Sequence, residues 1–142
     1  MFAHSNFMKT TYLLEKSLDV ESTRRRVIAD NIANVDVPHF KRREVNFESE
    51  LKRIVREREG DAQRYPGSLT NEKHIPFYHV RDVTDAQMRI NHDYSTSMRN
   101  DGNNVDIEKE MVDASKNMMR YNAYVTSIGN KFSSLKYIMR TG

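Results

Sequence analysis

The residues that could perform chemistry in this 142-residue chain form no catalytic or metal-binding pattern. The chain has no cysteine, which excludes disulfides and thiol chemistry. A metal site needs ligands that converge on one ion, and the five histidines neither recur at a four-residue spacing nor adjoin acidic clusters: His4, His39, His74, His79 and His92. The phosphate-binding glycine loop and the Gly-x-Ser-x-Gly motif are absent. We therefore expect no catalytic residue, no metal ion and no cofactor.

Two basic clusters could contact phosphate groups, at residues 24–26 and 41–43. Nucleic-acid sites usually add aromatic stacking platforms or a recognition helix. Here Glu44, Glu48 and Glu50 follow the second cluster, and 23 basic residues are interleaved with 20 acidic ones. The pattern favours salt-bridging surfaces, and a basic nucleic-acid-binding helical protein is the weaker alternative.

Composition limits how much core this chain can bury. Apolar residues make up 37% of the sequence and charged residues 30%, whereas a compact domain is usually about 45–50% apolar. Only a modest core can form, so we expect another chain to cover some apolar surface. No stretch approaches the ~20 apolar residues of a membrane span. The first residues also lack a cationic segment followed by an apolar run, so we expect no cleaved signal peptide.

The elements that would position side chains are mainly helical. Residues 107–139 carry apolar side chains at alternating steps of four and three, which predicts one helix with a narrow coiled-coil seam. The seam positions are Ile107, Met111, Ala114, Met118, Tyr121, Val125, Ile128, Phe132, Leu135 and Met139. Asp106 is a suitable N-cap for this helix.

A second long helix is predicted near residues 6–34, ending before Pro38. Its apolar stripe includes Leu14, Leu18, Ile28 and Ile32, which we assign to the same seam. A short helix is predicted near residues 47–59, and residues 60–104 are polar and irregular, with a short strand or hairpin arm over 75–83. We expect a discontinuous helical domain of residues 1–35 and 105–142, and a central segment of residues 36–104.

Residues 28–41 read Ile-Ala-Asp-Asn-Ile-Ala-Asn-Val-Asp-Val-Pro-His-Phe-Lys. This segment resembles the N-terminal signature of flagellar rod and hook proteins, A-x-N-I-A-N-x-x-T-P-G-Y-K. The chain departs from it at Val37, His39 and Phe40. The change at His39 matters most, because glycine permits a left-handed turn, although histidine tolerates positive φ better than most residues.

Residues 101–110, followed by Asn117, Tyr121 and Ala123, narrow the resemblance to the proximal-rod members of that family. The resemblance implies a mainly α fold whose terminal helices form an antiparallel coiled coil, with the central segment outside it. It also implies a structural, non-enzymatic subunit of a hollow shaft that crosses the bacterial periplasm and transmits torque from the membrane ring.

The resemblance further implies partners: copies of the same chain, the rod–ring adaptor protein FliE, the membrane-ring protein FliF, the rod protein FlgC and the flagellar type III export apparatus. We expect the family motif to form a fixed turn that contacts an adjacent subunit, with Phe40 as an exposed aromatic anchor. The motif positions are Asn31, Ile32, Ala33, Asn34, Asp36, Pro38, Phe40 and Lys41. A generic coiled-coil adaptor is the alternative function.

Overall fold

The computed structural model describes residues 6–61, 71, 73, 82–95 and 99–141. The elements follow in the order α1 (Asn6–Ala33), β1 (Arg43–Asn46), α2 (Glu48–Asp61), the 3-10 helix η2 (Val83–Asp85), β2 (Arg89–His92) and α3 (Ile107–Thr141). The chain divides into two compact units, one of residues 1–46 and 89–142, the other of residues 47–88. The mainly helical class predicted from the sequence is confirmed, including both long terminal helices.

Local chemistry sets the ends of the two long helices. The carboxylate of Asp106 accepts hydrogen bonds from the backbone amides of Glu108 (3.0 Å) and Lys109 (3.3 Å), which confirms it as the N-cap of α3. At the end of α1, the Asn34 side chain donates to the Asp30 carbonyl oxygen at 2.7 Å. The backbone amide of Asn34 donates to the same oxygen at 3.2 Å, so both donors of this residue close the last turn of α1.

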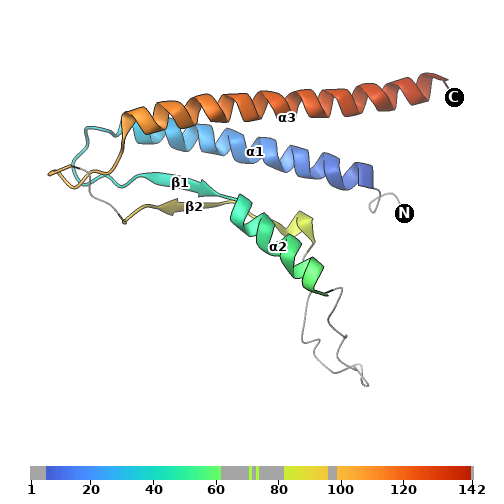
Figure 1. The fold of residues 1–142 in the computed structure, drawn as a ribbon, viewed down its shortest axis with the longest axis horizontal. Helices are drawn as coiled ribbons and strands as arrows, with labels where there is room; N and C mark the ends of the chain where they lie inside the picture. The colour runs from blue at the N-terminus through green and yellow to red at the C-terminus, as the bar shows by residue number, and fades with distance from the viewer. Residues whose placement is uncertain (1–5, 62–70, 72, 74–81, 96–98, 142) are drawn as a thin grey trace. The chain divides into compact units, whose positions relative to one another are not determined.

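The first unit has three layers. In Figure 1, α1 and α3 run antiparallel, and α1 lies between α3 and the two-stranded sheet of β1 and β2. The two strands pair antiparallel, with Val45 opposite Ile90. An isolated pair of strands is marginally stable, and here α1 supports the sheet: the Arg24 guanidinium donates to the Val45 carbonyl oxygen at 3.4 Å. The buried apolar side chains of this unit are Val20, Val27, Ile28, Val45 and Val105.

The two-stranded sheet belongs to the same compact unit as the two long helices. The expected discontinuous domain comprised residues 1–35 and 105–142, whereas the compact unit also contains the strands and the loops that lead into them. Each strand has only four residues, and the only apolar side chains are Val45 in β1 and Ile90 in β2. Strands this short carry too little alternation to be recognised in a sequence.

The second unit is built on α2. Helix α2 begins within a residue or two of its predicted start and contacts η2. The buried apolar side chains of this unit include Phe47, Ile54 and Ala86. A capping box of Asp82 and Asp85 fixes η2. The strand expected over 75–83 falls mostly outside the described residues, and Val83 at its end belongs to η2.

Candidate functional site

The two segments that carry the family resemblance interlock at one end of the helix pair. The Asn103 side-chain amide donates to the carbonyl oxygens of Asn34 (3.1 Å), Val35 (2.9 Å) and Val37 (2.9 Å). Its oxygen accepts from the Val105 amide at 2.7 Å, and the side chain is fully buried. One residue thus ties the chain leaving α1 to the chain entering α3.

A left-handed turn holds the tip of this junction. His39 has φ of 61° and donates its backbone amide to the Asp101 carbonyl oxygen at 3.0 Å. The Lys41 ammonium donates to the Gly102 carbonyl oxygen at 2.7 Å. The left-handed conformation is adopted here by histidine, a residue that tolerates positive φ better than most.

A buried ion pair connects the approach to β1 with the first turns of α3. The Arg42 Nε lies 2.6 Å from the Glu110 Oε1, and Glu110 is fully buried. Burial alone would lower the pKa of Arg42, but the hydrogen bond and charge of Glu110, with those of Glu44, outweigh it and raise that pKa above its ordinary value. Asn31 completes the site by donating to the second Glu110 oxygen at 3.2 Å.

Asparagine side chains attach the neighbouring backbone to the same site. Asn31 exchanges two hydrogen bonds with the backbone of Arg43, at 2.9 and 3.0 Å, as a strand partner would. Asn104 accepts from the Arg42 amide at 2.7 Å and donates to the Asp93 carbonyl oxygen at 2.8 Å. These asparagine groups are paired with good geometry, whereas the buried Nε of Arg43 has no hydrogen-bond partner among the described residues.

Further contacts along the helix pair of α1 and α3 show that a line of polar side chains on α3 faces α1. Asn117, which is buried, donates to the Glu21 carbonyl oxygen at 2.9 Å and also to the Glu21 carboxylate. Near the other end, the Lys131 ammonium hydrogen-bonds to Thr10 and lies 5.1 Å from the centre of the Phe7 ring. Glu110, Asn117 and Lys131 are separated by multiples of seven residues, so they share one face of α3.

This geometry corrects the expected packing of the apolar seam within one chain. Only Ala114 and Ile128 are half-buried. The other eight α3 positions are exposed: Ile107, Met111, Met118, Tyr121, Val125, Phe132, Leu135 and Met139. On α1, Ile28 is buried, and Leu14, Leu18 and Ile32 are half-buried. The polar anchors rotate α3 so that its apolar line lies beside the contact with α1 instead of in it.

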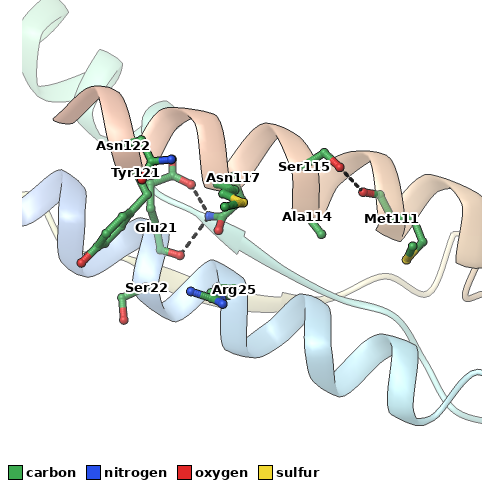
Figure 2. A pocket seen from close by; sticks show the side chains of 10 residues that line it. Glu21, Ser22, Arg25, Met111, Ala114, Ser115, Asn117, Tyr121 and Asn122 are labelled. Atoms are coloured by element: carbon green, nitrogen blue, oxygen red, sulfur yellow. Dashed lines mark hydrogen bonds between the residues drawn. The ribbon is translucent and has the colours of Figure 1, made fainter. Parts of the chain in front are cut away.

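A groove of about 460 Å³ opens between α1 and α3 next to this line. Figure 2 shows its lining, with the hydrogen bonds between Glu21 and Asn117 joining the two helices. Met111, Ala114 and Met118 contribute the apolar wall from α3. The groove and the exposed line together form one surface that the single chain leaves uncovered.

The expected subunit-contact residues of the family motif divide into two groups. Asn31 is buried, and Asn34, Ile32, Phe40 and Lys41 are half-buried within the chain, whereas Ala33, Asp36 and Pro38 are exposed. Phe40 is not the exposed anchor we predicted, because the Arg43 guanidinium lies 5.7 Å from the centre of its ring. Val37, next to Pro38, is a large apolar side chain that is exposed in this loop.

Within the described residues, no group of three or more histidine, aspartate or glutamate side chains could hold a metal ion. No helix in the same ranges is long and apolar enough to cross a membrane.

An antiparallel helix pair joined by interlocked loops, with an uncovered apolar line, defines a mainly helical protein built on its two terminal helices. The chain is 38% identical over 135 residues to the flagellar basal body rod protein FlgB of Borrelia hermsii, covering 94% of this chain and 98% of that protein. It is 33% identical over 138 residues to FlgB of Bacillus subtilis, covering 97% and 98%, and 26% identical over 129 residues to FlgB of Escherichia coli, covering 90% and 91%. No family model matches the chain. The chain belongs to the family of flagellar basal body rod proteins FlgB.

Proposed function

We propose that this chain is a non-enzymatic structural subunit of the proximal rod of the bacterial flagellar basal body. It polymerises through its terminal helices into the hollow shaft that transmits torque from the membrane ring. The observation that carries the proposal is the similarity to FlgB proteins of distant bacteria over nearly the full length of both chains.

The geometry supports a polymerising role. A torque shaft requires stiff elements, and α3 alone spans 35 residues, about 50 Å at ~1.5 Å per residue. It also requires lateral contacts, and the exposed line of α3 is a large apolar surface without cover in one chain. Exposed contiguous apolar surface usually marks an interaction site.

The remaining parts of the proposal concern location and neighbours. The subunit leaves the cytoplasm through the flagellar type III export apparatus, without a cleaved signal peptide, and is built into the periplasmic rod. Its neighbours there are further copies of itself, the adaptor FliE, the membrane-ring protein FliF and the rod protein FlgC. The membership of the FlgB family and the sequence motifs at residues 28–41 and 101–110 support this assignment.

Deletion of the gene in a motile host tests the function directly. We expect the deletion strain to lack rods and to regain them with the wild-type gene, and the protein to be present in purified basal bodies by mass spectrometry. A generic coiled-coil adaptor would instead be absent from basal bodies purified in high salt. Intact rods in the deletion strain would refute the proposed function.

A further inference from the structure

The hydrogen bonds of the two-stranded sheet show which backbone groups point out of it. The Asp93 amide donates to the Arg42 carbonyl oxygen at 2.8 Å, and these residues lie opposite each other, one step beyond the paired residues of the two strands. In an antiparallel pair, such hydrogen-bonded positions alternate with positions whose N–H and C=O groups point away from the partner strand. On β1 the outward groups therefore belong to Arg43 and Val45.

Side chains of α1 close the outer edge of β1. Asn31 hydrogen-bonds to both outward groups of Arg43, at 2.9 and 3.0 Å, and the Arg24 guanidinium donates to the Val45 carbonyl oxygen at 3.4 Å. A side-chain amide offers the same kinds of donor and acceptor as a peptide group, so Asn31 takes the place of a third strand. With α1 packed there, a strand of another chain has no access to this edge.

The outer edge of β2 is open. All four residues of the strand are exposed, and within the described part of the chain the outward N–H and C=O groups of Ile90 and His92 have no hydrogen-bond partner. Edge strands are usually protected by proline, lysine, a bulge or a covering element. Strand β2 contains neither proline nor lysine and pairs with β1 without a bulge. An edge of this kind can pair with an extended segment of another chain.

The side chains along this edge define the chemistry of the strand that would fit it. Ile90 is 51% exposed, and the His92 ring, on the same side of the sheet, stacks on that of Tyr94, which is 75% exposed. Arg89 is exposed and makes no ion pair with a described residue, and β2 contains no carboxylate. A strand with an apolar side chain beside Ile90 and an acidic one beside Arg89 complements this edge.

A second copy of the chain offers no such strand among its described residues. Its β1 is closed by α1, and pairing β2 with β2 of another copy requires a two-fold axis, whereas the subunits of a polar shaft share one orientation. We propose that the outer edge of β2 receives a strand from a different protein of the basal body, which extends the sheet to three strands. That strand carries an acidic side chain beside Arg89 and an apolar one beside Ile90. The inference rests on the proposed function, because that function places the chain next to other basal-body proteins.

Photo-cross-linking in purified basal bodies tests the pairing by its register. A benzophenone amino acid replaces Ile90 in one full-length chain and His92 in another, and the irradiated basal bodies are analysed by mass spectrometry. Both probes should link to one protein other than this chain, at residues two positions apart, because paired strands share a period of two. Links to another copy, links scattered over several segments, or no link in basal bodies that contain the probe would overturn the inference. Absence of the chain from basal bodies would instead refute the proposed function.

Proline substitution tests the backbone hydrogen bonds of the open edge. Ile90→Pro removes an outward N–H and keeps the bonds to β1, since an edge strand tolerates proline where its N–H faces away from the ladder. It should lower the yield of the cross-link from the His92 probe about tenfold, whereas Ile90→Ala, which keeps the N–H, should lower it less than about threefold. Equal yields in the two variants would contradict strand pairing. The register experiment needs no proline, so it decides the question where Ile90→Pro fails to assemble.

Charge reversal tests the acidic side chain of the incoming strand. Arg89→Glu should lower the yield of the cross-link from the Ile90 probe about tenfold, and Arg89→Lys should keep it within about threefold of the unsubstituted chain. Lys52→Glu, which changes the net charge equally at an exposed position of α2, is the matched control and should leave the yield unchanged. An unchanged yield with Arg89→Glu would show that no acidic side chain lies beside Arg89.

Discussion

At the scale of single residues, Gly102 and His39 share one crowded turn. Gly102 has φ of 77°, and a Cβ built on it would lie 2.9 Å from the His39 Nδ1. A side chain placed at residue 102 would therefore meet both an unfavourable backbone conformation and the imidazole of His39. Mutation can separate the two effects.

Gly102→Ala should lower the free energy of unfolding by about 1–2 kcal/mol, because an L side chain is unfavourable in the left-handed region. In a His39→Gly background the loss should be smaller, since the contact with the imidazole is gone. Urea unfolding of the four proteins measures both effects. Equal losses in the two backgrounds would show that the imidazole contact contributes nothing.

Asn103 tests the connection between the two motif segments. Asn103→Ala removes one donor group shared by three carbonyl oxygens, and we expect a loss of about 1–3 kcal/mol in the free energy of unfolding. Asn103→Asp should cost more, because a carboxylate would face the same three carbonyl oxygens. Asn100→Ala, at an exposed position in the same loop, is the matched control. Chemical denaturation should give the highest free energy of unfolding for the wild type, a lower one for the alanine variant and the lowest for the aspartate variant.

At the scale of elements, buried polar anchors determine which face α3 presents to α1. The Arg42–Glu110 pair lies at the start of the helix, and the Asn117–Glu21 pair lies two turns further along. These contacts have directional geometry, whereas apolar packing is non-directional. They therefore fix the rotation of α3 more strictly than its apolar side chains do.

Removing one partner of the buried ion pair should lower the free energy of unfolding more than replacing both partners. Glu110→Ala removes the buried partner of Arg42 and leaves only the more exposed carboxylates of Glu44 (3.1 Å) and Asp113 (3.5 Å) beside it. We therefore expect a loss of about 3 kcal/mol in the free energy of unfolding, the low end for breaking a buried pair. The double variant Arg42→Met with Glu110→Leu should lose less, because apolar groups of similar volume replace the pair. A double variant that is less stable than Glu110→Ala in thermal or urea unfolding would contradict this account.

At the scale of the whole molecule, α3 packs one side against α1 and leaves another side exposed. Ile128 is half-buried in the single chain, whereas Phe132 is 53% exposed. Substitution with the same charged residue at the two positions should therefore separate folding from assembly.

Ile128→Asp should destabilise the subunit and also prevent its incorporation into the rod. Phe132→Asp should leave the unfolding transition of the monomer within about 0.5 kcal/mol of wild type and still abolish motility. Ser133→Asp, beside Phe132 and exposed, controls for the added charge. Circular dichroism of the purified chains and swimming assays of complemented cells give the two measurements. Normal motility with Phe132→Asp would mean that this line is not an assembly surface.

The sequence alone determined the features that depend on neighbours along the chain. The start of α3 follows from Asp106, and the extent of both long helices follows from heptad spacing and Pro38. Each of these depends on hydrogen bonds or steric limits within a few residues, and such limits are visible in a short segment.

Only the tertiary structure decided which face of α3 meets α1. Asn31 and Glu110 are 79 residues apart in the sequence, and Glu21 and Asn117 are 96 apart. No pattern within a short segment therefore indicates these pairs. An apolar heptad line shows that a helix must be covered, but it does not distinguish a partner in the same chain from one in another. The position of Phe40 beneath Arg43 and the pairing of β1 with β2 were decided in the same way, because each depends on which side chains and strands the fold brings together.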